Sequence, residues 1–412
     1  MSNADFLVLG GGIAALNAAT AIRERNKLAD ILMVSDEPIL PYSRPMLSKS
    51  PLAGAPYGYP MQPKEWYDAQ RIQFRSATTT NAMNLAAKTI TLATGELITY
   101  DKCVYALGAA AGRPPIKGAD NGQVVTIRTA QDMRTLKSLA LGATKAVVIG
   151  GGVIGIEMAW ELKKAGILVV ILEIAETVMA RVFEPKIANI IENTVRESGI
   201  EIITNVGIQE IVNESSMCVR LNTGVEIPAD FIVLSAGIRP NIILAKEAGI
   251  DVQHSVVVDE HMRTSDPFVY ACGDCAQLND VNTGTWTQSQ AQGYIAGANA
   301  AGDHLVYKND PAPLHLNAAD TALFAVGDLG KQPNNDYEMY LLKSTAKCNP
   351  WAVNMAGGSQ GDSYCALYAV NSRITGAALI GDLSNMKKVH DAVREQKNIQ
   401  CLLQEVGKYE KV

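Results

Sequence analysis

The chain has 412 residues, of which 48% are hydrophobic and 19% charged, so it can bury a sizeable core and is not expected to be disordered. Its net charge of −6 argues against general nucleic-acid binding. No targeting signal is expected, and apolar runs such as 167–174 are shorter than the roughly 20 residues of a membrane span. The seven cysteines are scattered along the chain, which favours a reducing cytoplasm.

The first part of the chain alternates short apolar runs with helical patterns, which is typical of βαβ units and a parallel sheet. Residues 6–10 are predicted to form a strand, 14–25 a helix and 31–35 a second strand. Short strands of a meander are predicted next, at 77–84, 89–92 and 103–107, before a turn-rich linker at 112–115.

The same pattern returns at 145–150, 154–165 and 169–173, which indicates an internal duplication of one nucleotide-binding unit. A second linker at 236–241 precedes a strand and turn at 269–276 and a helix over about 287–301. After a linker at 310–313 comes a small module with strands at 338–342, 364–370 and 374–380 and a helical final piece at 384–406.

The predicted fold class is therefore α/β, with two Rossmann-like dinucleotide-binding domains and a small α+β C-terminal domain. The first domain is predicted to be discontinuous, comprising 1–110 and 240–313. The second spans 111–239, and the C-terminal domain spans 314–412.

Each unit has a glycine fingerprint between its first strand and its helix. Gly10 and Gly150 permit a sharp turn, and Gly12 and Gly152 let the backbone approach a pyrophosphate at the helix N-terminus. Close packing of helix on strand needs a small residue, here Ala15 or Gly155. Ala14 in the first copy, and Val153 and Ile154 in the second, complete the predicted binding turns.

An acidic residue about 20 positions after each fingerprint is expected to hold ribose hydroxyls. Asp36 or the adjacent Glu37 takes this place in the first unit, and Glu173 in the second. A carboxylate at Glu173 favours NADH over NADPH, because it would repel a 2′-phosphate. Two dinucleotide sites are most simply explained by a flavin, FAD, in the first unit and NADH in the second.

Five further segments resemble motifs of the two-dinucleotide-binding flavoprotein reductases, whose fold is that of glutathione reductase. The similarity is greatest to the NADH:rubredoxin reductases and the ferredoxin reductases of oxygenase systems, and covers about residues 5–305. The segments are PYSRPMLSK at 41–49, YALGA at 105–109, TIRTAQD at 126–132, YACGDCA at 270–276 and WTQSQAQG at 286–293. Two positions depart from the family pattern, Leu107 and Ser289.

The resemblance implies roles for individual residues. Lys49 would lie beside the flavin N5 edge and pair with Glu157, which would touch the nicotinamide. Asp274 would bind the ribityl chain of FAD. The other residues implied at the FAD site are Arg44, Thr80, Ala106, Gly108, Arg128, Trp286 and Thr287, and Gly237 is implied at the NAD site.

The cysteines argue against a thiol mechanism. Residues 38–60 contain no cysteine, and Ser43 and Ser48 occupy the neighbourhood in which the related NADH oxidases, peroxidases and coenzyme-A disulfide reductases have a redox cysteine. Cys272 and Cys275 are spaced as C-x-x-C, but they follow a predicted strand and are expected to be small core residues. The remaining cysteines lack metal-ligand spacing, so no metal site is predicted.

These observations predict an FAD enzyme that takes a hydride from NADH and passes electrons to a small redox protein, rubredoxin or ferredoxin. Two alternatives stay open: an NADH oxidase, peroxidase or coenzyme-A-type disulfide reductase, and an FAD-binding scaffold that acts as a redox-gated partner. The C-terminal module of the family commonly supports the flavin face or a dimer contact, so a homodimer is a further expectation.

Overall fold

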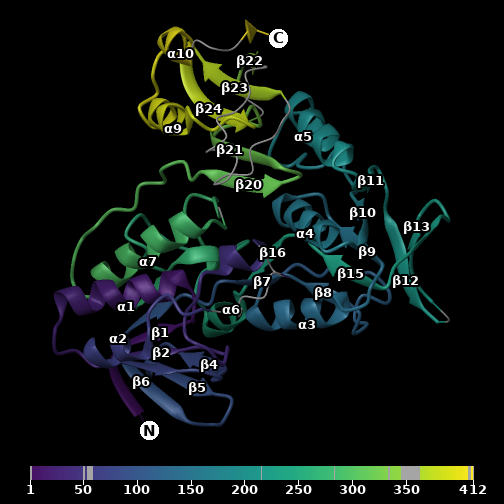
Figure 1. Ribbon diagram of the computed structural model, residues 1–412. Helices are drawn as coiled ribbons and strands as arrows, with labels where there is room; N and C mark the ends of the chain where they lie inside the picture. The colour runs from purple at the N-terminus through teal and green to yellow at the C-terminus, as the bar shows by residue number, and fades with distance from the viewer. Residues whose placement is uncertain are drawn as a thin grey trace.

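The computed structural model describes residues 2–49, 52, 59–214, 216–282, 284–332, 335–344, 362–406 and 410–411. Figure 1 shows three lobes: a first lobe of purple and blue strands with the green helix α7, a second lobe in teal, and a C-terminal lobe in light green and yellow. The predicted α/β class, with two parallel-sheet lobes and a smaller C-terminal lobe, is confirmed.

The first lobe is built on a sheet of order β3-β2-β1-β6-β5-β4, with β18 also paired to β6. Strands β1, β2, β3, β6 and β18 are parallel, whereas β4 and β5 are antiparallel. The strands are β1 (Ser2–Leu9), β2 (Ile31–Val34), β3 (Ile72–Arg75), β4 (Thr80–Asn84), β5 (Thr89–Leu92), β6 (Leu97–Tyr105) and β18 (Val269–Ala271).

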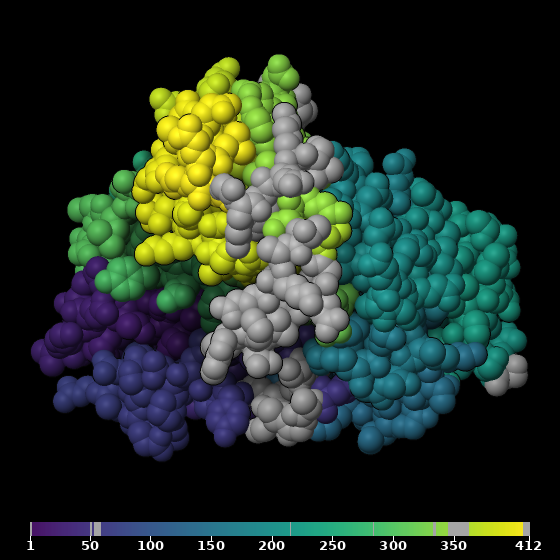
Figure 2. All heavy atoms as spheres, turned by 45° about the horizontal axis from the view of Figure 1, so that its top comes forward, coloured from purple at the N-terminus to yellow at the C-terminus, as the bar shows by residue number. Residues whose placement is uncertain are grey.

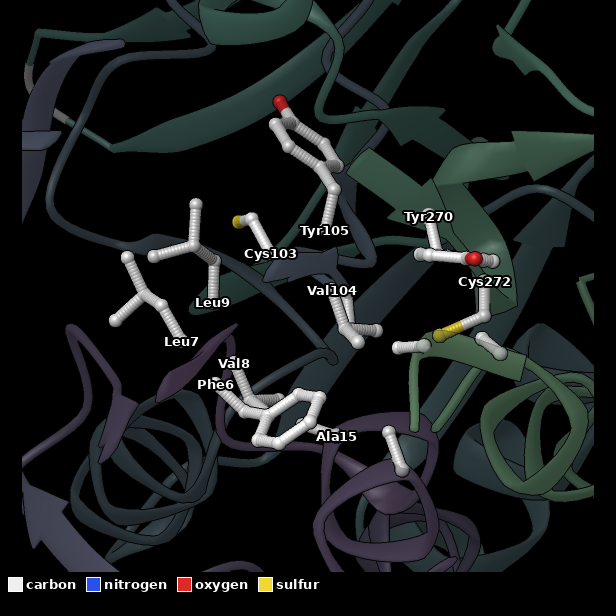
Figure 3. Close-up of a cluster of buried hydrophobic side chains, with 14 of the residues drawn as sticks. Phe6, Leu7, Val8, Leu9, Ala15, Cys103, Val104, Tyr105, Tyr270 and Cys272 are labelled. Carbon is white, nitrogen blue, oxygen red and sulfur yellow. The ribbon is translucent and has the colours of Figure 1, made fainter. Parts of the chain in front are cut away.

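The middle of this sheet is buried on both faces, which explains its nearly continuous apolar sequence. In Figure 3, Leu7 and Leu9 lie on the side of Cys103 and Tyr105, whereas Phe6 and Val8 point toward Ala15. The strand predicted at 77–84 begins three residues later, because Ala77 has a left-handed backbone with φ of 49°.

Two long helices, α1 (Ile13–Arg25) and α7 (Trp286–Ala300), pack closely against each other in this lobe. A Cβ added to Gly293 would lie 2.2 Å from Ala14 O, and one added to Gly297 would lie 2.2 Å from Ala18 O. Glycine therefore permits this approach. The shorter elements are η1 (Arg44–Leu47), α2 (Lys64–Ala69), α6 (Ile243–Ala248), η2 (Gly273–Cys275), β17 (Val256–Val257) and β19 (Ala276–Gln277).

The second lobe repeats the arrangement with a parallel sheet of order β11-β10-β9-β15-β8. Its strands are β8 (Val124–Thr126), β9 (Lys145–Ile149), β10 (Leu168–Leu172), β11 (Glu201–Ile203) and β15 (Phe231–Leu234). Its helices are α3 (Ala130–Ala140), α4 (Val153–Lys164) and α5 (Pro185–Glu197). A smaller antiparallel sheet consists of β12 (Ile208–Asn213), β13 (Met217–Leu221) and β14 (Glu226–Pro228).

Two passages of chain connect the first and second lobes, and they run side by side. β7 (Ala109–Ala111) pairs antiparallel with β16 (Ile238–Pro240), and Gly112 N donates to Gly237 O at 2.8 Å. The chain thus leaves the first lobe and returns to it at one place (Figure 1).

The C-terminal lobe is an antiparallel sheet of order β20-β21-β24-β23-β22-β25 with two helices against it. Figure 2 shows this lobe seated across the junction of the other two. Its elements are β20 (Leu314–Ala318), β21 (Thr321–Gly327), β22 (Glu338–Ser344), β23 (Ser363–Val370), β24 (Arg373–Ile380), β25 (Glu410–Lys411), α9 (Met386–Arg394) and α10 (Ile399–Val406).

The segment 384–406, predicted to be helical, forms two helices. Gln396 has φ of 49°, and Lys397 N donates back to Ala392 O, so the chain turns between α9 and α10. Among the described residues, no helix has the length and apolar character needed to cross a membrane.

Candidate functional site

A cavity of about 500 Å³ lies at the carboxyl ends of β1, β2 and β6, where α4 of the second lobe meets the first lobe. This edge of a parallel sheet is the usual place for a bound nucleotide. Most residues predicted for the FAD site line it: Gly10, Gly12, Ala14, Asp36, Arg44, Lys49, Thr80, Ala106, Gly108, Arg128, Asp274 and Trp286. Three residues predicted for the NAD site also line it, namely Val153, Ile154 and Glu157.

The first glycine loop forms one wall of the cavity. Gly10 has φ of 129°, and a Cβ there would lie 2.1 Å from Ala106 O, so this position requires glycine. At Gly12 a Cβ would meet no protein atom within 4 Å. The space in front of Gly12, at the N-terminus of α1, is thus open to a phosphate group. Ala15 lies behind the cavity and is fully buried.

The two acids after β2 have different surroundings. Asp36 is exposed on the cavity wall. Glu37 is instead bound by its own neighbours, since Oε2 accepts a hydrogen bond from Tyr42 Oη at 2.8 Å and Oε1 forms an ion pair with Arg44. This arrangement favours Asp36 as the residue available to a ribose.

Asp274 lies at the base of the cavity with both carboxylate oxygens bound. Arg128 Nη2 lies 2.6 Å from Oδ2, and Ser289 Oγ donates to Oδ1 at 3.1 Å. Ser289 stands on α7 where alanine is usual in the family pattern, so this chain adds a hydrogen bond there. Trp286, the first residue of α7, lines the cavity, whereas Thr287 is not among its lining residues.

Lys49 and Glu157 come together from different lobes. Lys49 Nζ lies 2.7 Å from Glu157 Oε1, and Ser48 Oγ donates to Oε2 at 2.5 Å. The Glu157 side chain is 4% exposed and the Lys49 side chain 32%, so the carboxylate is enclosed while the cation reaches the cavity.

The second glycine loop lies outside the cavity, at the start of α4. Cβ atoms on Gly150 and Gly155 would come within 2.2 Å of Ser235 O and 2.0 Å of Gly150 O respectively, whereas one on Gly152 would meet nothing within 4 Å. Gly237, with φ of 82°, lies in the linker beside this loop.

Glu173 is bonded to the second loop itself. Its Oε2 accepts from Gly151 N at 2.6 Å, and its Oε1 accepts from Ala175 N at 2.9 Å. The carboxylate therefore stands beside the loop at the end of β10, where a ribose bound along the loop would meet it.

The cysteine pair is enclosed. Cys272 and Cys275 are fully buried free thiols, and Cys275 Sγ donates to Cys272 O at 3.3 Å. Burial raises the pKa of the Cys275 thiol to about 12 and that of Cys272 well above its ordinary value. Although Cys272 lines the cavity, neither sulfur has the thiolate character that redox chemistry needs.

Sequence reasoning missed several residues. Gly11 and Gly151, at the middle positions of the two loops, have little room for a side chain, because Cβ atoms there would lie 2.3 Å from Ser35 Oγ and 2.7 Å from Val178 Cγ1. The triple-glycine runs were the available signal. Asn241 and His315 also line the cavity, and no local pattern marks either residue.

Comparison with known proteins agrees with this geometry. The family model described as pyridine nucleotide-disulphide oxidoreductase matches residues 4–293. A rubredoxin-NAD(+) reductase of Pseudomonas putida is 32% identical over 313 residues, covering 74% of this chain and 81% of that protein. An NADH oxidase of Methanocaldococcus jannaschii is 33% identical over 313 residues, covering 72% of this chain and 70% of that protein.

Among solved structures, the ferredoxin reductase for the CYP199A2 system from Rhodopseudomonas palustris superposes with a TM-score of 0.82 at 26% identity, covering 93% of each chain. The sequence match, the superposition and a cavity lined by both the first glycine loop and α4 of the second unit agree. The chain belongs to the pyridine nucleotide-disulphide oxidoreductase family.

Proposed function

We propose that this chain is an FAD-dependent reductase that takes a hydride from NADH and delivers electrons to rubredoxin or ferredoxin. The observation that carries the proposal is the shared cavity, which the first glycine loop and α4 of the second nucleotide unit both line. Lys49 and Glu157 meet where the two units join, so a flavin and a nicotinamide would meet there too.

The described residues fit FAD. The open space before Gly12 and the N-terminus of α1 suit a pyrophosphate, and Asp36 suits a ribose. Asp274, fixed by Arg128 and Ser289, would hold the ribityl chain, with Arg44, Thr80, Ala106, Gly108 and Trp286 as further contacts. The cavity volume, about 500 Å³, is within the range of cofactor sites.

For the nicotinamide cofactor we propose NADH rather than NADPH. Glu173 presents a carboxylate where a 2′-phosphate would otherwise lie, and the next residue, Ile174, is 75% exposed and brings no positive charge. The adenosine half would follow Gly150–Gly155 and Gly237, and the reactive end would reach Val153, Ile154 and Glu157 at the cavity.

Bound FAD supplies a two-electron acceptor that can release its electrons singly. Hydride transfer needs no acid or base from the protein, so these side chains orient the rings and stabilise the negative charge that reduction creates. Lys49, held by Glu157, supplies a cation, and the N-terminus of α7 supplies a positive dipole end.

A small electron carrier is the proposed acceptor, because relatives named for rubredoxin and ferredoxin cover most of this chain. The Ser48 hydroxyl, bonded to Glu157, cannot form the sulfenate or mixed disulfide of thiol-dependent relatives. An NADH oxidase is the second candidate, since one relative has that name.

One experiment separates these outcomes. Purified holoenzyme reduced by NADH is offered rubredoxin, ferredoxin, oxygen and disulfides in parallel. We expect a yellow protein, faster reduction by NADH than by NADPH, and fastest turnover with a carrier protein. A colourless protein that takes up no flavin contradicts the FAD assignment, and fastest turnover with oxygen would favour the oxidase.

Three further proposals concern the organisation of the protein. The domain limits that we propose are 1–110 with 240–313, 111–239 and 314–412, supported by the β7–β16 pairing at the crossing points. A reducing, cytoplasmic location is supported by the free thiols of the described cysteines. A homodimer is proposed from the family resemblance alone.

A further inference from the structure

One segment of the first lobe, residues 42–49, leaves its own core and packs into the second lobe; we name it the arm. Tyr42 and Leu47 are 2% and 4% exposed, and they belong to the same buried cluster as Ile127 and Met133 of the second lobe. The arm ends at Ser48 and Lys49, the two residues that bind Glu157.

The start of the arm is hydrogen-bonded to the second lobe through Tyr42. Its phenolic oxygen accepts from Ala130 N, at the first residue of α3, at 3.0 Å, and donates to Glu37 Oε2 at 2.8 Å. Burial raises the pKa of Tyr42 to about 12, so the phenol keeps the proton that it donates.

Arg44 makes the second attachment. Its Nη1 donates to Arg128 O at 2.8 Å, and its Nη2 pairs with the Glu37 carboxylate. Arg128 in turn pairs with Asp274 in the cavity. Glu37 thus binds both Tyr42 and Arg44, and it fixes the arm from the side of the first lobe.

The far end of the arm is attached to α4, where Ser48 and Lys49 together occupy both oxygens of Glu157. The arm therefore spans two points of the second lobe, the start of α3 and the first turns of α4. Since the nicotinamide would approach along α4, displacement of the arm would move the hydride donor relative to the flavin.

We propose that the arm sets the distance between the two nucleotide-binding lobes for hydride transfer, with Tyr42 and Glu37 as positioning residues. This inference rests on the proposed function, because it assigns the arm to that reaction. It also gives Glu37 a role other than the ribose contact that the sequence suggested.

The test uses holoenzyme with Tyr42→Phe, which removes one oxygen and keeps the packed ring. Tyr67→Phe is the matched control, because Tyr67 is 2% exposed in the first lobe and its hydroxyl has no hydrogen-bond partner among the described residues. Stopped-flow reduction over a range of NADH concentrations separates the limiting rate from the NADH Kd. Hydrogen exchange at the Ala130 amide reports the contact without turnover.

We expect Tyr42→Phe to lower the limiting rate of flavin reduction by roughly tenfold, because a misplacement of the reacting groups by about 1 Å can slow a reaction by that factor or more. The NADH Kd and the FAD content should stay unchanged, the Ala130 amide should exchange faster, and Tyr67→Phe should match the wild type. Glu37→Gln, which keeps an acceptor for Tyr42 but loses the charge facing Arg44, should slow reduction in the same way and serves if Tyr42→Phe does not fold.

Two results would overturn the inference: a wild-type limiting rate in the folded variant, even with faster exchange at Ala130, or loss of FAD, which would place Tyr42 in the flavin site. If the wild-type holoenzyme is not reduced by NADH at all, it is the proposed function that fails. The exchange measurement would still show whether Tyr42 holds Ala130, but the arm would then have no part in hydride transfer.

Discussion

Gly10 and Gly12 lie two residues apart in the first loop and are glycines for different reasons. The backbone of Gly10 is left-handed and pressed against Ala106, so the fold itself requires it. The space beside Gly12 contains no protein atoms, so the fold does not require glycine at this position and only a bound ligand would.

This contrast gives a prediction for Gly12→Ala. The FAD-free protein should melt at the wild-type temperature, while FAD affinity should fall by at least about tenfold, because a methyl group would obstruct the approach of phosphate to the backbone. Thermal melts and flavin titration measure the two effects. Gly10→Ala should instead destabilise the protein with or without FAD. Wild-type affinity in Gly12→Ala would place the pyrophosphate elsewhere.

Glu173 is predicted to set the choice of nicotinamide cofactor. Glu173→Gln removes the negative charge and places an amide NH2 against the backbone N–H of either Gly151 or Ala175. The ratio of kcat/KM for NADH over NADPH should therefore fall by roughly tenfold, about 1.4 kcal/mol. Glu176→Gln, an exposed acid three residues on, is the control. An unchanged ratio would remove Glu173 from cofactor selection.

The buried thiols of Cys272 and Cys275 are predicted to take no part in turnover. With a pKa of about 12, Cys275 is protonated at pH 8, so iodoacetamide should modify the exposed Cys401 and leave Cys272 and Cys275 intact, as mass spectrometry can show. Turnover should survive in the double variant Cys272→Ser, Cys275→Ser. Its loss, in a folded protein that retains FAD, would revive the dithiol hypothesis.

At the scale of elements, the position of α7 depends on its contact with α1. Gly293→Ala would put a Cβ 2.2 Å from Ala14 O, and backbone atoms cannot rotate out of the way as a side chain can. We expect a loss of stability of at least about 1–3 kcal/mol, together with weaker FAD binding as the start of α7 moves from the cavity. Gly122→Ala, with nothing within 4 Å of the added Cβ, should melt as the wild type.

Some elements were accessible to sequence reasoning because local chemistry determines them. The central strands of the two sheets are buried on both faces, and the glycines of each turn lie within a few positions of one another in the sequence. The break between α9 and α10 was missed because it depends on a left-handed Gln396, a residue with no strong turn preference.

The features of the site that could not be predicted from the sequence are contacts between residues that lie far apart in the chain. The family pattern suggested the pairing of Lys49 with Glu157, but nothing near Tyr42 in the chain points to Ala130. Likewise, Asp36 and Glu37 are equivalent by spacing, and only the position of Arg44 and Tyr42 in space distinguishes them.

For the whole molecule, the C-terminal lobe places His315 in the cavity near Lys49. Partial desolvation at the cavity wall, and then the nearby Lys49 charge, lower the pKa of this imidazole, although His315 remains exposed. Below the ordinary imidazole pKa the unfolded chain therefore binds a proton at His315 more readily than the folded chain does. The folded state keeps its full stability above that pKa, about 6.5, and loses stability as the pH falls below it.

His315→Gln should accordingly reduce the fall in Tm between pH 7 and pH 5. His304→Gln, at a position that does not line the cavity, is the control. Calorimetry across this range makes the measurement. An identical fall in wild type and His315→Gln would mean that the imidazole titrates freely, and so does not face Lys49 in solution.

The pairing of β7 with β16 has a consequence for engineering. The outgoing and returning strands are hydrogen-bonded neighbours, and Gly112 N donates to Gly237 O. The two ends of the second lobe therefore lie side by side where the lobe joins the rest of the protein. A short hairpin turn could close the gap, or an unrelated domain with neighbouring termini could be spliced in its place. Such a graft would leave the strand order of the first sheet untouched, and would turn a two-nucleotide enzyme into a flavin carrier ready for a different source of electrons.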